Sequence, residues 1–212
     1  MSRSPDVLLP RLYAIVDPAQ AGGRSVLEIT EQLLAAGVRL IQLRDKNASS
    51  GELYSTAKLM AERIGRAGGI FVVNDRADVA RAIDADGVHL GQDDLPVESA
   101  RALLGSDKMI GHSTHTLSQV VTTHDYPLDY LAFGPIFSTS SKQNPDAVVG
   151  LAGLREARKA TRKPLVAIGG ITLENARSVI EAGADSVAVI RDLIGAQDVR
   201  ARAEEFLKKI AG

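Results

Sequence analysis

The chain has 212 residues, of which 45% are hydrophobic and 24% are charged, and its formal net charge is −1. Because neither sign of charge dominates, we expect no general affinity for nucleic acid or for an anionic membrane. The chain has no cysteine, which excludes disulfides, thiolate chemistry and zinc–sulfur sites. The sequence has no apolar run of the ~18–20 residues that span a bilayer and no signal-peptide pattern at its start, so we expect a cytoplasmic protein.

Short apolar runs alternate with stretches of helical periodicity along the whole chain, and glycine or proline often separates them. The expected strands cover residues 12–16, 38–43, 70–73, 87–90, 108–111, 130–133, 165–168 and 186–190. The expected helices cover residues 25–36, 52–66, 77–83, 97–104, 117–124, 153–160, 173–182 and 199–210. Strands that are each followed by a helix predict a parallel sheet with helices on its outer face.

This order of elements favours an α/β fold with a single (β/α)8 barrel, and a doubly wound open sheet is the alternative. The segment AAGVRLIQL at 35–43 is similar to EAGADSVAV at 181–189, which suggests related helix–turn–strand units. Because no linker or shift in composition divides the chain, we expect one domain over residues 1–212. In a barrel, functional side chains gather on the loops at the carboxyl ends of the strands.

The segment DYLAFGPIFSTSSK at 129–142 begins with an apolar run that is typical of a buried strand. The run stops at Gly134 and Pro135, and hydroxyl side chains then lead to Lys142. Hydroxyl and amide donors beside a lysine suit an anionic ligand. A flexible polar surface loop is the alternative.

Cationic side chains follow the second expected strand. Strand alternation places Gln42, Arg44 and Lys46 on one side. Two cations and an amide at the mouth of a barrel indicate an anionic ligand, and a solvated cluster of charges is the alternative.

Carboxylates follow the third and fourth expected strands, with Asp75 after one and the pair Asp93 and Asp94 after the other. Magnesium prefers oxygen ligands and typically takes one or two carboxylates together with water and substrate phosphates. We therefore expect Asp75 and one of the pair to hold Mg²⁺. The alternatives are a helix cap for Asp75 and a turn residue before Pro96 for Asp94.

The remaining strand ends carry small donors, imidazoles and glycines. Ser113 is a candidate donor after the fifth strand, and the alternative is that it caps the next helix. His89 lies within a strand, where an ordinary hydrogen-bonded interior histidine is the alternative. Gly169 and Gly170 allow close backbone approach and leave N–H groups at the start of the seventh helix for a phosphate, which Arg191 could also meet.

Together the strand ends predict a site for phosphorylated ligands and magnesium. They include no strong nucleophile and no unmistakable general base. A leaving pyrophosphate needs neither, because Mg²⁺ and cationic side chains neutralise its charge.

Eight motifs occur in order over nearly the whole chain: LYAIVD (12–17), IQLRDK (41–46), NDR (74–76), GVHLGQDDL (87–95), GHSTHT (111–116), DYLAFGPIFSTSSK (129–142), VAIGGI (166–171) and GADSVAVI (183–190). As a set they resemble the thiamine phosphate synthase family. The resemblance implies a (β/α)8 barrel that joins a hydroxymethylpyrimidine diphosphate to a thiazole phosphate, or to its carboxylate. The products would be thiamine phosphate and pyrophosphate, formed after dissociative loss of pyrophosphate and attack by the thiazole nitrogen.

The resemblance also implies a role for each matched residue. The implied metal ligands are Asp75 and Asp94. The implied contacts to the pyrimidine diphosphate are Arg44, Lys46, Asn74 and Lys142, with Gln42 and Ser113 near the pyrimidine or its leaving group. The implied thiazole phosphate site comprises Thr139, Ser141, Gly170 and the backbone of Val189 and Ile190. Lys142, Ser113 and Arg44 are the residues expected to act on the chemistry.

Two positions depart from the family pattern. Ser141 stands where a second threonine is common and keeps a hydroxyl. Arg191 stands where a small hydroxyl residue is usual, and it either replaces that hydroxyl by a charge or turns away and pairs with Asp192 or a helix at the barrel rim. An alternative within the fold is a thiazole tautomerase, which would use a histidine near the sixth strand, where this chain has Gly134 and Pro135. A second alternative is a non-catalytic regulator that binds phosphorylated ligands. The partners expected are small phosphorylated pyrimidine and thiazole molecules, and a homodimer is possible.

Overall fold

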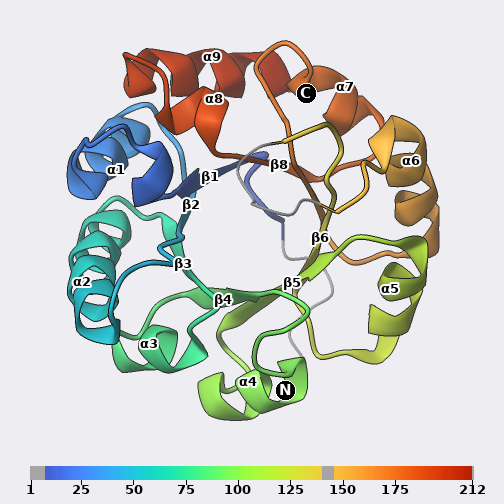
Figure 1. Ribbon diagram of the computed structural model, residues 1–212, viewed down its shortest axis with the longest axis horizontal. Helices are drawn as coiled ribbons and strands as arrows, with labels where there is room; N and C mark the ends of the chain where they lie inside the picture. The colour runs from blue at the N-terminus through green and yellow to red at the C-terminus, as the bar shows by residue number, and fades with distance from the viewer. Residues whose placement is uncertain (1–7, 140–145, 212) are drawn as a thin grey trace.

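The computed structural model describes residues 8–139 and 146–211. Within them, the parallel strands form a closed barrel in which each strand pairs with its neighbours in sequence and the last pairs with the first. Figure 1 shows the barrel along its axis, with the helices outside it. The strands are β1 (Leu12–Val16), β2 (Leu40–Leu43), β3 (Ile70–Asn74), β4 (Gly87–Leu90), β5 (Met109–Thr114), β6 (Tyr130–Phe133), β7 (Leu165–Ile168) and β8 (Ser186–Val189). The barrel prediction is confirmed, and the open sheet is excluded.

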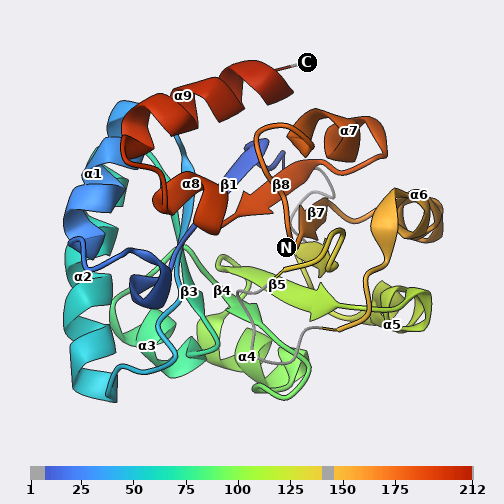
Figure 2. The same cartoon turned by 45° about the horizontal axis from the view of Figure 1, so that its top comes forward.

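The helices follow the strands in alternation and cover the outside of the barrel (Figure 2). They are α1 (Val26–Ala35), α2 (Ser50–Arg66), α3 (Ala77–Ala82), α4 (Val97–Leu104), α5 (Leu117–Thr122), α6 (Gly150–Ala160), α7 (Ala176–Glu181), α8 (Arg191–Ile194) and α9 (Val199–Ile210), with short 3-10 turns η1 (Pro18–Gln20) and η2 (Thr123–Asp125). α8, a single turn between β8 and α9, was not predicted from the sequence. Among the described helices, none is long and apolar enough to cross a membrane.

Two element boundaries differ from prediction in ways that affect the site. β5 continues to Thr114, so Ser113 is part of a strand and has a fixed direction. α7 begins three residues later than expected, because side chains bind the backbone that precedes it. Thr172 N donates to Asn175 Oδ1 at 2.9 Å, and Leu173 N donates to Asp192 Oδ2 at 2.8 Å.

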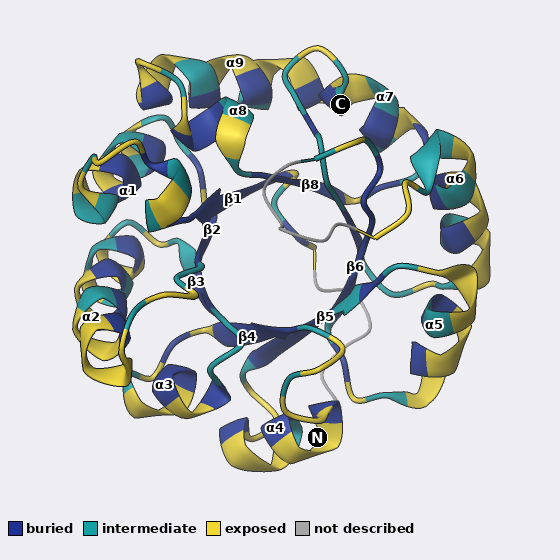
Figure 3. Cartoon of the chain, viewed as in Figure 1, coloured by how far each residue is buried: buried dark blue, intermediate teal, exposed yellow. Residues whose placement is uncertain are grey.

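The core has two parts, on the two sides of the barrel wall. The larger part lies between strands and helices, and the smaller one fills the barrel with alternate residues such as Tyr13, Val72 and Tyr130. Figure 3 shows each helix buried toward the barrel and exposed on its outer side. Val189 belongs to the outer part. Its side chain therefore points away from the barrel interior, and only its backbone can contribute to a site there.

The predicted relation between the turns at Gly37 and Gly183 is confirmed. Both glycines follow a helix and have positive φ, 97° and 111°, which suits glycine because it lacks a Cβ. At the first turn, Gly37 N donates to Leu34 O and Val38 N to Leu33 O. The second turn repeats both hydrogen bonds at the same spacing, from residues 183 and 184 to residues 180 and 179.

Aspartates stabilise the amino end of the barrel by a repeated contact. Asp86, Asp129 and Asp185 directly precede β4, β6 and β8. Each accepts a hydrogen bond, through Oδ2, from a backbone N–H near the start of the preceding strand. These N–H groups belong to Phe71, Ile110 and Leu165, at 2.8, 2.7 and 2.7 Å.

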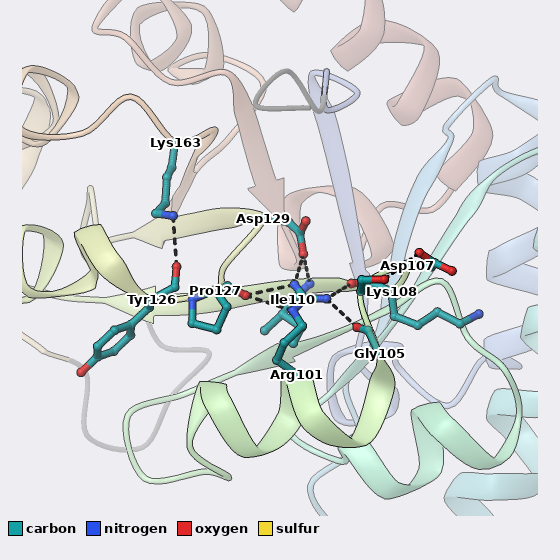
Figure 4. Close-up of polar contacts among 10 residues, drawn as sticks. Arg101, Gly105, Asp107, Lys108, Ile110, Tyr126, Pro127, Asp129 and Lys163 are labelled. Carbon is teal, nitrogen blue, oxygen red and sulfur yellow. Dashed lines mark hydrogen bonds and ion pairs between the residues drawn. The ribbon is translucent and has the colours of Figure 1, made fainter. Parts of the chain in front are cut away.

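Arg101 adds a further polar cluster at this end (Figure 4). From α4, its guanidinium donates to Asp129 Oδ2 at 2.6 Å and to the carbonyl oxygens of Gly105, Lys108 and Pro127. These contacts tie α4, the turn that enters β5 and the loop that enters β6. The side chains of Arg101 and Asp129 are only 20% and 9% exposed, so removing one partner leaves the other desolvated without its counter-charge.

Arg101→Met should therefore lower the free energy of unfolding by about 2–4 kcal/mol, as expected for breaking a mostly buried charged hydrogen-bond cluster. Urea denaturation measures the change. The matched control is Arg177→Met, because Arg177 forms an exposed ion pair with Glu181 on α7 and should change stability by no more than about 0.5 kcal/mol. Equal effects of the two substitutions would contradict a structural role for the cluster.

Candidate active site

A cavity of about 500 Å³ opens at the carboxyl ends of the strands. Its floor is aliphatic and includes Ile15, Ala132, Val166 and Ala188. The polar lining residues from the side of β2 to β5 are Gln42, Arg44, Asn74, His89, Ser113 and His115. Those from the side of β6 to β8 include Ser138, Thr139, Asp146, Thr172, Arg191 and Asp192. The cavity thus has an apolar base and two polar walls, which suits a flat ring system that carries charged groups.

Gln42 and Arg44 lie in the wall as strand alternation predicted. Gln42 is buried within β2, and Arg44 N extends the strand pairing by donating to Val16 O at 2.9 Å. The Arg44 guanidinium forms an ion pair with Asp17, a buried carboxylate at the end of β1. Asp17 was not singled out by sequence reasoning, since only the β1–β2 pairing brings it to Arg44.

Lys46 lies with the carboxylates rather than in the cavity lining. Its Nζ is 3.0 Å from Asp75 Oδ2. Asp75 follows β3 with a positive φ of 63°, and its N–H donates to His89 O at 2.8 Å. The carboxyl group of Asp94, from the loop after β4, lies close enough to the Asp75 carboxyl group to raise the pKa of Asp75. The structure therefore brings together the two acids that the sequence placed on separate loops.

The electrostatics of this pair suit a cation. Burial and the neighbouring Asp94 raise the pKa of Asp75 above its ordinary value, and Lys46 only partly offsets them. Among the described residues, no cluster of three or more acidic or histidine side chains could hold a metal ion. Two carboxylates fit Mg²⁺, which commonly completes its coordination with water and substrate phosphate oxygens.

The alternatives for the two acids have different outcomes. A helix cap is wrong for Asp75, because α3 begins after Arg76 and has no side-chain cap. Asp94 does bind its own loop, since Oδ2 accepts from Gly91 N at 2.6 Å. That contact fixes the direction of the carboxylate, so Asp94 does have the turn role, and its role as a metal ligand stays a prediction.

Ser113 and His89 form a direct contact inside the barrel. Ser113 Oγ lies 2.9 Å from His89 Nε2, and both residues line the cavity. The capping alternative for Ser113 is wrong, because Thr116 caps α5 in a capping box with Gln119. The alternative for His89, an ordinary hydrogen-bonded interior histidine, is confirmed, and His89 also lines the cavity.

The glycine pair after β7 packs against the loop after β6. Phe137 N donates to Gly169 O at 3.0 Å, and a Cβ on Gly170 would lie 2.4 Å from Ser138 O. The predicted close approach is therefore confirmed, and its partner is protein backbone. The prediction of free N–H groups at the start of the seventh helix is wrong for Thr172 and Leu173, whose N–H groups bind side chains.

The short helix α8 supplies a different candidate for the phosphate. Its N-terminal residues Ile190, Arg191 and Asp192 line the cavity, as do Gly170 and Thr139. Phosphate sites of barrel proteins often combine the loops after the last two strands with the N-terminus of a short extra helix. Of the remaining predicted residues, Ser141 and Lys142 lie outside the described residues, so their roles stay predictions.

His115 lies next to the end of β6, a position that was not predicted from the sequence. Its Nδ1 lies 2.7 Å from Gly134 O and 3.4 Å from Asp146 Oδ2. The 134–135 segment itself has no histidine, but the pairing of β5 with β6 brings His115 to the same mouth. Its side chain lines the cavity.

Comparison with known proteins shows the family of this chain. The family described as thiamine monophosphate synthase matches residues 12–193. The chain belongs to this family. A thiamine-phosphate synthase from Koribacter versatilis (strain Ellin345) is 51% identical over 94% of the chain and 95% of the relative. One from Shouchella clausii (strain KSM-K16) is 44% identical over 93% and 94%. The structure of a thiamine phosphate pyrophosphorylase from Pyrococcus furiosus superposes with a TM-score of 0.86 at 36% identity, covering 95% of this chain and 97% of that one.

Because the pKa of Asp75 is raised, its ionised form should lower the stability of the folded protein at neutral pH. A carboxyl group whose folded pKa is raised adds stability below its unfolded pKa and loses it as pH rises through the folded value. In metal-free protein, Asp75→Asn should therefore raise the melting temperature at pH 7 and lose this advantage toward pH 3.

Asp78→Asn is the matched control, because Arg76 lowers the pKa of Asp78 and this substitution should lower the melting temperature at pH 7. Calorimetry at both pH values makes the comparison. A loss of stability in Asp75→Asn at pH 7 would contradict the repulsion between the two carboxylates.

Proposed function

We propose that this protein condenses a hydroxymethylpyrimidine diphosphate with a thiazole phosphate to give thiamine phosphate and pyrophosphate. The carrying observation is that Asp75, Asp94 and Lys46 lie together after β3, β4 and β2, at the same rim from which Arg44 and Asn74 line the cavity. Acids and cations at the same rim suit a magnesium-bound diphosphate, which is anionic and needs both. Membership of the thiamine monophosphate synthase family supports the same reaction.

Asp75 and Asp94 are the residues that would hold Mg²⁺, and Lys46 would exchange part of its contact with Asp75 for the diphosphate. The bound ion would neutralise charge on the leaving pyrophosphate. Arg44 offers a planar fork of N–H donors whose direction Asp17 fixes. Asn74 ends β3 beside them and lines the cavity, where its amide can donate to a further phosphate oxygen.

The pyrimidine would lie over the aliphatic floor, with Gln42 at its edge. The bond between the methylene carbon and the diphosphate oxygen breaks, and the bonding electrons leave with pyrophosphate. The thiazole nitrogen lone pair then forms the new carbon–nitrogen bond and becomes a quaternary thiazolium. No proton leaves the nucleophile, so the reaction needs no general base. The aliphatic side chains of the floor would disfavour ordered water next to the cationic carbon.

The thiazole phosphate would bind at the opposite wall, which comprises Thr139, Gly170 and the start of α8. Backbone at Val189 and Ile190 would complete this subsite, and Ser141 is expected to add a hydroxyl. Arg191 lines the cavity here and replaces the small hydroxyl residue of the family pattern by a cation. We propose that it meets the thiazole phosphate directly.

Neither alternative function gains support from the relatives reported above, which are named as synthases. His115 stands at the mouth where a tautomerase would need a histidine, but the tautomerase reaction gives no use for the pair of carboxylates, Asp75 and Asp94. A non-catalytic regulator would bind the same ligands without releasing pyrophosphate.

The deciding experiment mixes the purified protein with both phosphorylated heterocycles, with and without Mg²⁺. Thiamine phosphate and pyrophosphate should form in equal amounts and only with the metal. Asp75→Asn should need far more Mg²⁺ for half-maximal rate, whereas the nearby surface variant Asp78→Asn should keep the wild-type requirement. Binding of both ligands without any product would favour the regulator, and an unchanged requirement in Asp75→Asn would reject the metal site.

The proposed role of Arg191 predicts a selective kinetic defect. Arg191→Ser should raise the KM for thiazole phosphate at least tenfold, since a hydrogen bond to a charged group contributes about 1.5–3 kcal/mol. The KM for the pyrimidine diphosphate should stay near the wild-type value. Steady-state kinetics with each substrate varied in turn tests this, with Arg200→Ser on the outer helix α9 as the control. An unchanged KM for thiazole phosphate would remove Arg191 from the subsite.

A further inference from the structure

A continuous chain of hydrogen bonds crosses the inside of the barrel beneath the cavity. Gln42 Nε2 donates to Tyr13 Oη at 2.7 Å, and Tyr13 Oη lies 3.0 Å from Tyr130 Oη. Tyr130 Oη lies 3.0 Å from His89 Nδ1, and His89 Nε2 lies 2.9 Å from Ser113 Oγ. The chain thus joins Gln42 to Ser113, two cavity residues on different strands, through groups that the reaction itself does not use.

The packing holds this chain in one geometry. Tyr13 and Tyr130 are fully buried and meet edge to face, with ring centroids 6.0 Å apart. The Tyr130 ring also stacks on His89 with centroids 5.6 Å apart. Gly111 makes room for it, since a Cβ at that position would lie 2.0 Å from Tyr130 Cζ. The hydroxyl groups therefore have little freedom to exchange partners.

The number of protons determines which group donates at each step of this chain of hydrogen bonds. Burial raises the pKa of both phenols, so each keeps its single proton. Each phenol has two partners here and can donate to one of them only. Because Gln42 donates to Tyr13, Tyr13 donates to Tyr130 and Tyr130 donates to His89 Nδ1. A neutral His89 then carries its proton on Nε2 and donates it to Ser113.

We propose that Tyr13 and Tyr130 are positioning residues that hold His89 in its Nε2–H tautomer and thereby make Ser113 a hydrogen-bond donor to the cavity. With its oxygen accepting from His89, the Ser113 hydroxyl directs its own proton toward the ligand. If every hydrogen bond ran in the opposite direction, Ser113 would donate to His89. Its oxygen would then present lone pairs to the cavity, which repel an anionic diphosphate. The benefit to diphosphate departure rests on the proposed function, whereas the tautomer does not.

Nitrogen-15 NMR of the ligand-free protein near neutral pH tests the tautomer without any assay of activity. The chain has four histidines, and His89→Gln identifies the signals of His89 by their loss. In the wild type, Nδ1 should be unprotonated and Nε2 protonated. Tyr130→Phe removes the donor to Nδ1 and should give a mixture of tautomers. A proton on Nδ1 in the wild type, or unchanged populations in Tyr130→Phe, would overturn the proposal.

Kinetics then test the consequence. Tyr130→Phe should lower kcat about tenfold, less than the 10²–10³ expected when a preorganised donor is deleted outright. The KM for thiazole phosphate should not change. Tyr13→Phe breaks the chain one link earlier and should give the same pattern, whereas Tyr126→Phe, outside the chain, should behave as the wild type.

The two measurements separate failure of the inference from failure of the proposed function. A wild-type protein that shows the Nε2–H tautomer and forms no thiamine phosphate would refute the function and keep the tautomer. A wild-type protein that is active, with normal kcat in both phenylalanine variants, would refute the positioning role.

Discussion

The hydrogen bonding of β1 to β8 is the constraint on which the rest of the structure depends. Leu12 pairs with Val187 and Ala14 with Val189, which closes the sheet into a barrel. Closure brings strand ends from distant parts of the chain to one rim, so that Arg44 and Arg191 line the same cavity. An open sheet of the same strands would leave the first and last strand ends on opposite edges and would divide the two walls of the site.

The two ends of the barrel use charge in opposite ways. At the amino end, Asp129 and Asp185 each meet an arginine and a strand N–H, so their negative charge is compensated. At the carboxyl end, Asp75 faces Asp94 and is only partly compensated by Lys46. Such uncompensated charge costs stability and is typical of sites that bind a ligand of opposite charge. We infer that the amino end stabilises a barrel whose other end is kept ready for a cation and a polyanion.

The order of the elements followed from the sequence because apolar runs and helical periodicity are local signals. The gathering of Asp75 and Asp94 followed from topology, since adjacent parallel strands end at the same rim. What the sequence did not predict depends on contacts between distant residues. Asp17 reaches Arg44 through the pairing of β1 with β2, and His115 reaches Gly134 through the pairing of β5 with β6. The start of α7 likewise depends on Asp192, which is nineteen positions from Leu173.

The central claim is that the rim binds a diphosphate and a divalent cation together, each improving the affinity for the other. Isothermal titration of the wild-type protein with inorganic pyrophosphate, at a series of Mg²⁺ concentrations, tests it most directly. The account predicts one pyrophosphate per chain, bound at least tenfold more tightly at saturating Mg²⁺ than in its absence, which corresponds to about 1.4 kcal/mol of coupling. Pyrophosphate binding of equal strength at every Mg²⁺ concentration, or no binding at all, would contradict it.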